Sequence, residues 1–139
     1  MLKTEHAMGL LVGLLVIKFA NALGFERDRS FYPTVLIVVA SYYLLFAAMG
    51  GAHRAFAAEA LAFVCFLMLA ALAAKRSRRL VAMGLIAHGI YDFLHPCIVA
   101  NPGVPDWWPG FCLTFDLTVG AGLLCASPKR AESAQRSAP

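Results

Sequence analysis

The fold is decided by residues 80–100, which read LVAMGLIAHGIYDFLHPCIVA. Asp92 is the single acidic residue of this stretch, which holds no lysine and no arginine. A helix that crosses a lipid bilayer needs about 20 mostly apolar residues. A strand of a membrane barrel is only about ten residues long and alternates in polarity. We therefore predict that this stretch is a transmembrane helix.

Four further stretches have the same character. Hydrophobic residues make up 60% of the 139 residues and charged residues 14%, whereas a soluble domain is about a quarter charged. This composition excludes a soluble globular domain, a disordered chain and a coiled coil. We predict an all-α polytopic membrane bundle over residues 1–126, with spans at residues 7–25, 33–49, 55–74, 80–100 and 109–126. A mobile cytoplasmic tail, residues 127–139, is predicted to follow.

The basic residues predict the orientation of the bundle. One side of the membrane receives Lys3 and Arg54, and the other receives Arg27, Arg29, Lys75, Arg76, Arg78, Arg79, Lys129, Arg130 and Arg136. Cytoplasmic loops carry the excess of lysine and arginine, so we expect the N-terminus outside and the C-terminus in the cytoplasm, in the inner membrane of a bacterium. The net charge of +4 thus reflects topology, and no motif indicates a nucleic-acid partner.

A cleaved signal peptide is the alternative for the first span. Lys3, the apolar run that follows it and the sequence Ala20-Asn21-Ala22 resemble such a segment. Cleavage would leave four helices and would place the basic residues at positions 27–29 and 75–79 outside the membrane. That outcome reverses the positive-inside rule, so we expect the first span to be retained.

Ionisable residues inside the spans are the candidate functional residues, because each is costly in lipid. His88, Tyr91, Asp92 and His95 are spaced by 0, 3, 4 and 7 positions and share one helical face. Three further polar residues lie in other spans: Ser41, Glu59 and Asp116. At 1.5 Å per residue, five of these residues lie about 6 to 13 Å below the outer ends of their spans: Ser41, Glu59, Asp92, His95 and Asp116. We expect them to converge in the outer leaflet, with Asp116 against the polar face of residues 80–100.

Imidazole and carboxylate groups at this spacing suit metal ligation. We predict that His88, Asp92 and His95 bind a divalent metal ion such as zinc. Asp116 or Glu59 would be a further ligand or a general base. Ser41 and Tyr91 would be orienting donors. A bound ion would activate water, as in a metal-dependent membrane hydrolase acting on a lipid or other small substrate.

Two other functions stay open. The same groups could relay protons or form a carrier or binding site for a metal ion or a small ligand. They could also be a buried hydrogen-bonded network that holds the helices of a structural membrane subunit together. The lipid bilayer is the partner common to all three interpretations.

Other features of the spans carry narrower expectations. Lys18, with Asn21 one turn away, either pairs with an intramembrane carboxylate, which we slightly favour, or extends its amine to the interface. The Gly9–Gly13 pair is expected to pack within the bundle rather than to form a dimer seam. Cys97 and Cys112 should lie at one level, and rotation of their helices decides whether they are bridged; we expect two free buried thiols rather than a disulfide.

Two interfacial segments have both a structural and a functional interpretation. Residues 26–30, ERDRS, form either a solvated cytoplasmic turn or a site for an anionic headgroup. Residues 106–108, DWW, form either an outer aromatic belt or a lid over the polar cluster.

Two segments resemble a family of small bacterial integral membrane proteins of unknown function. They are residues 26–33 leading into 41–43, and residues 88–95 continued by Asn101, Pro105, Trp107-Trp108-Pro109, Cys112 and Asp116. The resemblance implies a membrane location and no particular activity. A looser similarity is to the seven-helix membrane hydrolases of the alkaline ceramidase type, which place Ser, Asp and His around zinc. This chain departs from them in having five spans, and His-x3-Asp-x2-His in place of His-x3-His.

Overall fold

The computed structural model describes residues 3–126, and this part of the chain is all-helical, with no strand. Its helices are α1 (Thr4–Leu23), the short 3-10 helix η1 (Phe25–Arg27), α2 (Phe31–Met49), α3 (His53–Arg76), α4 (Arg78–Ile98) and α5 (Trp108–Cys125). Each α-helix is long and apolar enough to cross a membrane. The predicted five-helix membrane bundle is confirmed, whereas the predicted tail lies outside the described residues.

The helix ends are close to those expected, and the largest difference has a clear cause. Helix α1 begins at Thr4 rather than at Ala7. Hydropathy cannot detect this first turn, because its residues are polar, but an acidic side chain such as Glu5 is favourable at a helix N-terminus. Helix α3 similarly continues through Lys75 and Arg76, since cations are favourable at a C-terminus.

Local sequence explains where the chain turns. Gly24 ends α1 with a φ of 74°, in the left-handed region that favours glycine. Gly51 has a φ of 64° in the turn between α2 and α3. The Ser77 hydroxyl accepts a hydrogen bond from the Leu80 amide at 3.2 Å and so caps the start of α4. Pro33 and Pro109 occupy the first turns of α2 and α5, where a missing amide hydrogen is tolerated.

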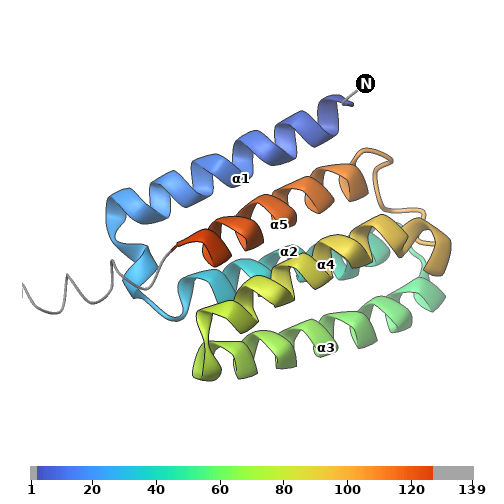
Figure 1. Cartoon of the computed structure of the whole chain (residues 1–139). Helices are drawn as coiled ribbons and strands as arrows, with labels where there is room; N and C mark the ends of the chain where they lie inside the picture. Colours follow the sequence, from blue (N-terminus) through green and yellow to red (C-terminus); the bar gives the residue numbers. More distant parts are fainter. Residues whose placement is uncertain (1–2, 127–139) are drawn as a thin grey trace, which may run out of the picture.

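Helix α5 lies between α1 and α4, while α2 and α3 complete the other side of the bundle (Figure 1). The contact of α1 with α5 depends on small residues. A Cβ atom at Gly9 would collide with the Phe111 carbonyl and the Thr114 hydroxyl, and one at Gly13 would lie 3.0 Å from the Thr118 Cβ. The Gly9–Gly13 pair thus packs within the bundle, as predicted.

Apolar and polar side chains occupy different halves of the bundle. The buried apolar core lies toward the α3–α4 turn and includes Leu36, Val81, Leu85 and Val119. From His88 onward, the buried face of α4 becomes polar, toward the end where the α4–α5 loop lies. The candidate site therefore lies in the half of the bundle next to the α4–α5 loop, which we call the loop half. The other half of the bundle is filled by apolar side chains.

Candidate metal site

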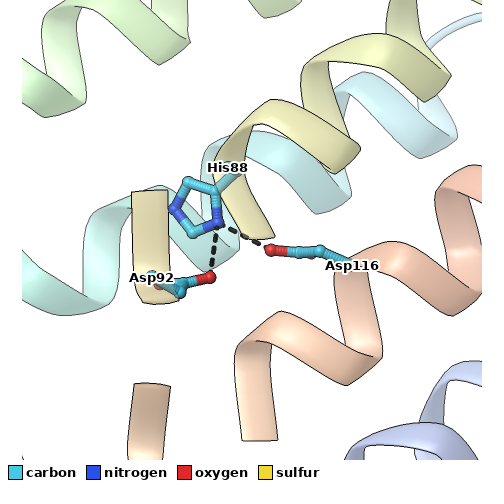
Figure 2. Close-up of side chains that lie close together, drawn as sticks. All are labelled: His88, Asp92 and Asp116. Atoms are coloured by element: carbon cyan, nitrogen blue, oxygen red, sulfur yellow. Dashed lines mark hydrogen bonds and ion pairs between the residues drawn. The ribbon is translucent and has the colours of Figure 1, made fainter. Parts of the chain in front are cut away.

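The deepest polar group joins α4 to α5 and consists of His88, Asp92 and Asp116 (Figure 2), which we call the inner cluster. The His88 Nδ1 atom lies 2.7 Å from Asp116 Oδ2 and 3.2 Å from Asp92 Oδ2. All three residues are completely buried. The prediction that Asp116 meets the polar face of α4 is confirmed.

Gly89 makes this close contact between the helices possible. A Cβ atom at this position would lie 3.2 Å from both the Asp116 Cβ and the Leu113 carbonyl oxygen. That is tighter than an ordinary van der Waals contact, which is about 3.5–4.0 Å between carbon atoms. Glycine next to His88 therefore brings α4 near enough to α5 for the imidazole to reach the Asp116 carboxylate.

The inner cluster has more acceptors than donors. Apart from the ion-pair contact of Asp92 Oδ2 with His88 Nδ1 at 3.2 Å, both oxygens of Asp92, the Oδ1 of Asp116 and the Nε2 of His88 are buried without a hydrogen bond among residues 3–126. A further donor near Asp92, the Tyr43 hydroxyl, is also buried without a hydrogen bond. A neutral imidazole carries only one N–H, and even an imidazolium carries only two. Buried acceptors without partners are costly and rare in proteins. This chemistry fits a group that accommodates a cation.

The inner cluster also has the geometry of a ligand set. One ligand atom from each of His88, Asp92 and Asp116 lies within 4.8 Å of the other two. One imidazole and two carboxylates are typical ligands of zinc, manganese and iron(II). The sequence interpretation placed His95 in this set with Asp116 as an optional member, whereas the structure groups Asp116 with His88 and Asp92.

His95 belongs to a second group, Glu59, Tyr91, His95 and Asn101, which we call the outer cluster. The Glu59 Oε1 lies 2.7 Å from the His95 Nε2 and accepts a hydrogen bond from the Asn101 Nδ2 at 2.9 Å. The Glu59 Oε2 accepts one from the Tyr91 hydroxyl at 3.0 Å. Both oxygens of this buried carboxylate are therefore satisfied, in contrast to those of Asp92.

Asn101 was not singled out among the candidate site residues, and it links the α4–α5 loop to two helices. Its amide nitrogen also donates to the Tyr43 carbonyl at 3.1 Å, and its Oδ1 accepts from the Gly103 amide at 3.2 Å. The Tyr43 ring is stacked on the His95 ring at 3.9 Å. Asn101 is one of the residues that carry the family resemblance, but its position before Pro102 indicates only a turn and not a partner.

Ser41 lies apart from both clusters. Its hydroxyl donates to the Val38 carbonyl of its own helix at 2.7 Å, a common arrangement for serine within a helix. Helix α2 contributes Tyr43 to the outer cluster instead. The predicted catalytic roles of Ser41, Tyr91, Glu59 and Asp116 remain predictions, because geometry alone does not test them.

Lys18 and the cysteines face different surroundings. Lys18 is exposed on α1, and no carboxylate of residues 3–126 forms an ion pair with it, so the structure favours extension of its amine to the interface. All four cysteines are free. Cys112 is buried whereas Cys97 is exposed, so the two side chains occupy different sides of their helices.

The two interfacial segments also have defined structures. Trp108 packs against Tyr42 and Phe46, with ring centroids 4.8 and 5.0 Å away, and Trp107 is about half exposed, as in an aromatic belt. At the opposite end, the Ser30 amide and hydroxyl both donate to Asp28 Oδ1, at 2.9 and 2.8 Å. These two hydrogen bonds, the backbone one first, lower the pKa of the exposed Asp28 carboxyl.

Comparison of the chain with protein-family models, with curated proteins and with solved structures found no match. The resemblance to the small bacterial membrane family therefore stays a prediction. The helical fold and the chemistry of the site define a class of protein. The chain is a bundle of helices that are long and apolar enough to span a membrane, with a buried His/Asp group that could bind a metal ion.

Proposed function

We propose that this membrane protein binds one divalent metal ion through His88, Asp92 and Asp116. The observation that carries the proposal is the excess of buried acceptors in the inner cluster. Two carboxylates and one imidazole converge there with ligand atoms within 4.8 Å of one another. A divalent cation would offset the repulsion between the two carboxylates and would coordinate the oxygens that lack a donor.

The outer cluster provides an internal comparison. It also contains a buried carboxylate and an imidazole, but its Glu59 is saturated by hydrogen bonds from three side chains. Such a network is complete without an ion and has the form of interhelical glue. The two clusters therefore divide the functions that the sequence assigned to one site: ion binding for the inner cluster and structural support for the outer cluster.

Three protein ligands leave coordination positions for water, and a bound ion would then supply Lewis acidity and a lowered pKa of that water. This chemistry is what a membrane hydrolase would require. A hydrolase also needs access for its substrate, and His88, Asp92 and Asp116 are completely buried. Burial favours ion binding, including storage or carriage of the ion, over hydrolysis of a lipid ester or amide.

A proton could take the place of the metal ion. A proton shared between Asp92 and Asp116 would remove one negative charge and supply one more donor. Even with the Tyr43 hydroxyl as a further donor to Asp92, it would still leave one of the four acceptor atoms unpaired. A metal ion fits the group better, because it would coordinate an oxygen from each carboxylate together with the imidazole.

Metal analysis of the detergent-purified full chain tests the proposal. After incubation with zinc, manganese or iron(II) and removal of excess ion, elemental analysis should find about one ion per chain for one of these metals. Asp116→Asn and His88→Gln should each lower the affinity at least tenfold, since even residues behind the ligands of metal sites contribute that much.

His95→Gln is the matched control, because His95 belongs to the outer cluster and should leave metal binding unchanged. If His95→Gln lost the metal ion and Asp116→Asn kept it, the ligands would be those predicted from the sequence, with His95 in place of Asp116. That result would refute the proposed ligand set. Absence of stoichiometric metal from the folded wild-type protein, with all three ions, would assign the inner cluster to proton binding or to structure.

We further propose that the loop half of the bundle faces outward, with the N-terminus outside and the C-terminus in the cytoplasm of a bacterial cell. The support is the placement of Arg78 and Arg79 at the start of α4 and of Lys75 and Arg76 at the end of α3. Reporter fusions at the two termini test this orientation, and an externally active C-terminal reporter would contradict it.

A further inference from the structure

An apolar groove runs between α1 and α2 and against α5, and none of the residues of the two polar clusters lines it. Its volume is about 470 Å³, and its walls are Val12 and Val16 of α1, the side of α2 from Phe31 to Tyr42, and the side of α5 from Trp108 to Phe115. It exists because α1 is packed mainly on α5 through glycines, which leaves α1 separated from α2. All three walls belong to helices that are long and apolar enough to cross a membrane.

The size of the groove decides between two kinds of occupant. Along α2 it extends from Phe31 to Tyr42, which is about 16 Å at 1.5 Å per residue. A helix of a second copy, about 10 Å across, would need roughly 1,300 Å³ over that length. A single extended hydrocarbon chain, about 5 Å across given the contact distances between carbon atoms, needs roughly 300 Å³. The groove has room for one whole hydrocarbon chain, whereas a helix of a second copy could enter it only with its side chains.

A polar group at one end indicates how such a chain would be oriented. Trp108 lines the groove, and its indole Nε1 is buried without a hydrogen-bond partner among residues 3–126. Buried indole N–H groups usually have an acceptor. Trp108 begins α5, at the end of the bundle where the membrane interface lies and where ester groups of lipids are found. The Nε1 atom has no exposed surface, so the indole must rotate toward the groove before an ester carbonyl oxygen there accepts this hydrogen bond.

We propose that this groove binds one acyl chain of a bilayer phospholipid, with the ester carbonyl of that chain accepting a hydrogen bond from Trp108. The walls are mostly apolar and carry no charged side chain, which favours a hydrocarbon ligand, and the open side lets a chain enter from the bilayer. The proposal is independent of the metal site, because none of the three metal ligands lines the groove.

Photolabelling of the full chain in vesicles tests the position of the lipid. The probe is phosphatidylcholine with a diazirine at the middle of one acyl chain, and cross-linked peptides are identified by mass spectrometry. Labels should be concentrated severalfold on the groove sides of α1, α2 and α5. Val35→Phe narrows the groove and should lower that labelling at least fivefold, while the metal content of the protein stays unchanged.

Val64→Phe is the matched control, because Val64 is exposed on α3 and is absent from the groove walls. It should leave the labelling pattern as in the wild type. Even labelling of all lipid-exposed helices, unaffected by Val35→Phe, would overturn the proposal. So would a zero-length cross-link that joins two copies of the chain through the groove.

A second experiment examines the hydrogen bond without filling the groove. The wild type should retain the ester-linked probe about fivefold better than its ether-linked counterpart, since one hydrogen bond contributes roughly that factor. Trp108→Phe keeps an aromatic ring at the site and should abolish this preference. Equal retention of the two probes by the wild type would refute the assigned role of Trp108.

Discussion

Replacing Glu59 by leucine removes the acceptor of three hydrogen bonds and should destabilise the bundle by about 2–5 kcal/mol. His95, Tyr91 and Asn101 all lose their shared partner, at distances of 2.7, 3.0 and 2.9 Å. Interhelical hydrogen bonds in membrane proteins contribute about 0.6 kcal/mol on average and at most about 1.7 kcal/mol each, and three of them give this range. The buried His95 and the partly buried Tyr91 are left without this acceptor, whereas Asn101 keeps the Tyr43 carbonyl, so the middle of the range is the better expectation.

The measurement is the free energy of unfolding from titration with sodium dodecyl sulfate in mixed micelles. Two controls separate the lost hydrogen bonds from other effects. Glu59→Gln keeps a carbonyl acceptor of similar size and should cost less than half as much. Ala58→Leu adds the same leucine side chain at an exposed position of α3 and should change the free energy of unfolding by less than about 0.5 kcal/mol.

A Glu59→Leu protein as stable as the wild type would refute the assigned role of the outer cluster. It would mean that the three donors find other partners at no cost. Replacement of a complete buried polar network by apolar residues is often neutral, whereas removal of one partner is strongly destabilising. The triple variant with His95→Leu and Asn101→Leu should therefore recover part of the stability that Glu59→Leu loses.

Three further expectations follow from the packing and the turns. Gly9→Leu should separate α1 from α5 and lower the free energy of unfolding by about 1–3 kcal/mol. Ala7→Leu, on the exposed side of α1, should leave the free energy of unfolding unchanged in the same titration. A maleimide should modify two thiols in the folded protein, Cys97 and Cys125 near the ends of α4 and α5, and four after denaturation. Cys112 is buried, and Cys65 faces lipid in the middle of α3, where the reactive thiolate does not form; a native count of four would contradict the placement of Cys112. Ser30→Ala should raise the pKa of Asp28 toward its ordinary value, only in part because the backbone bond remains, and NMR titration of the carboxyl would show no change if the hydroxyl contributes nothing.

The candidate site could be predicted in part from the sequence. The spacing of His88, Tyr91, Asp92 and His95 places them on one face of α4, since helical periodicity is a local property. The short connection to α5 places Asp116 beside that face. The level of each polar residue along the bundle also follows from its distance to the end of its helix. Each of these arguments uses only the position of a residue along its own helix. Together they identified seven candidate residues, and the structure places all of these except Ser41 in the two clusters.

The division into two clusters could not be predicted in this way. Rotation of each helix about its own axis decides that Asp116 faces His88 and that Glu59 faces His95. Rotation depends on how neighbouring surfaces interlock, which no single segment specifies. For the same reason Ser41 turns to Val38 of its own helix while Tyr43, two residues later, enters the outer cluster.

Sequence alone determined that the chain forms five apolar helices, where they begin and end to within three residues, and which face of α4 is polar. Hydrophobic length, turn residues and the 3.6-residue period are enough for these features because they depend on contacts within one segment. Only the tertiary structure decided that His88, Asp92 and Asp116 form the ligand group, that Asn101 joins the loop to Glu59, and that α1 leaves a groove beside α2. Those features arise where segments distant in the chain meet, and close approach at residues such as Gly9 and Gly89 sets which side chains can touch.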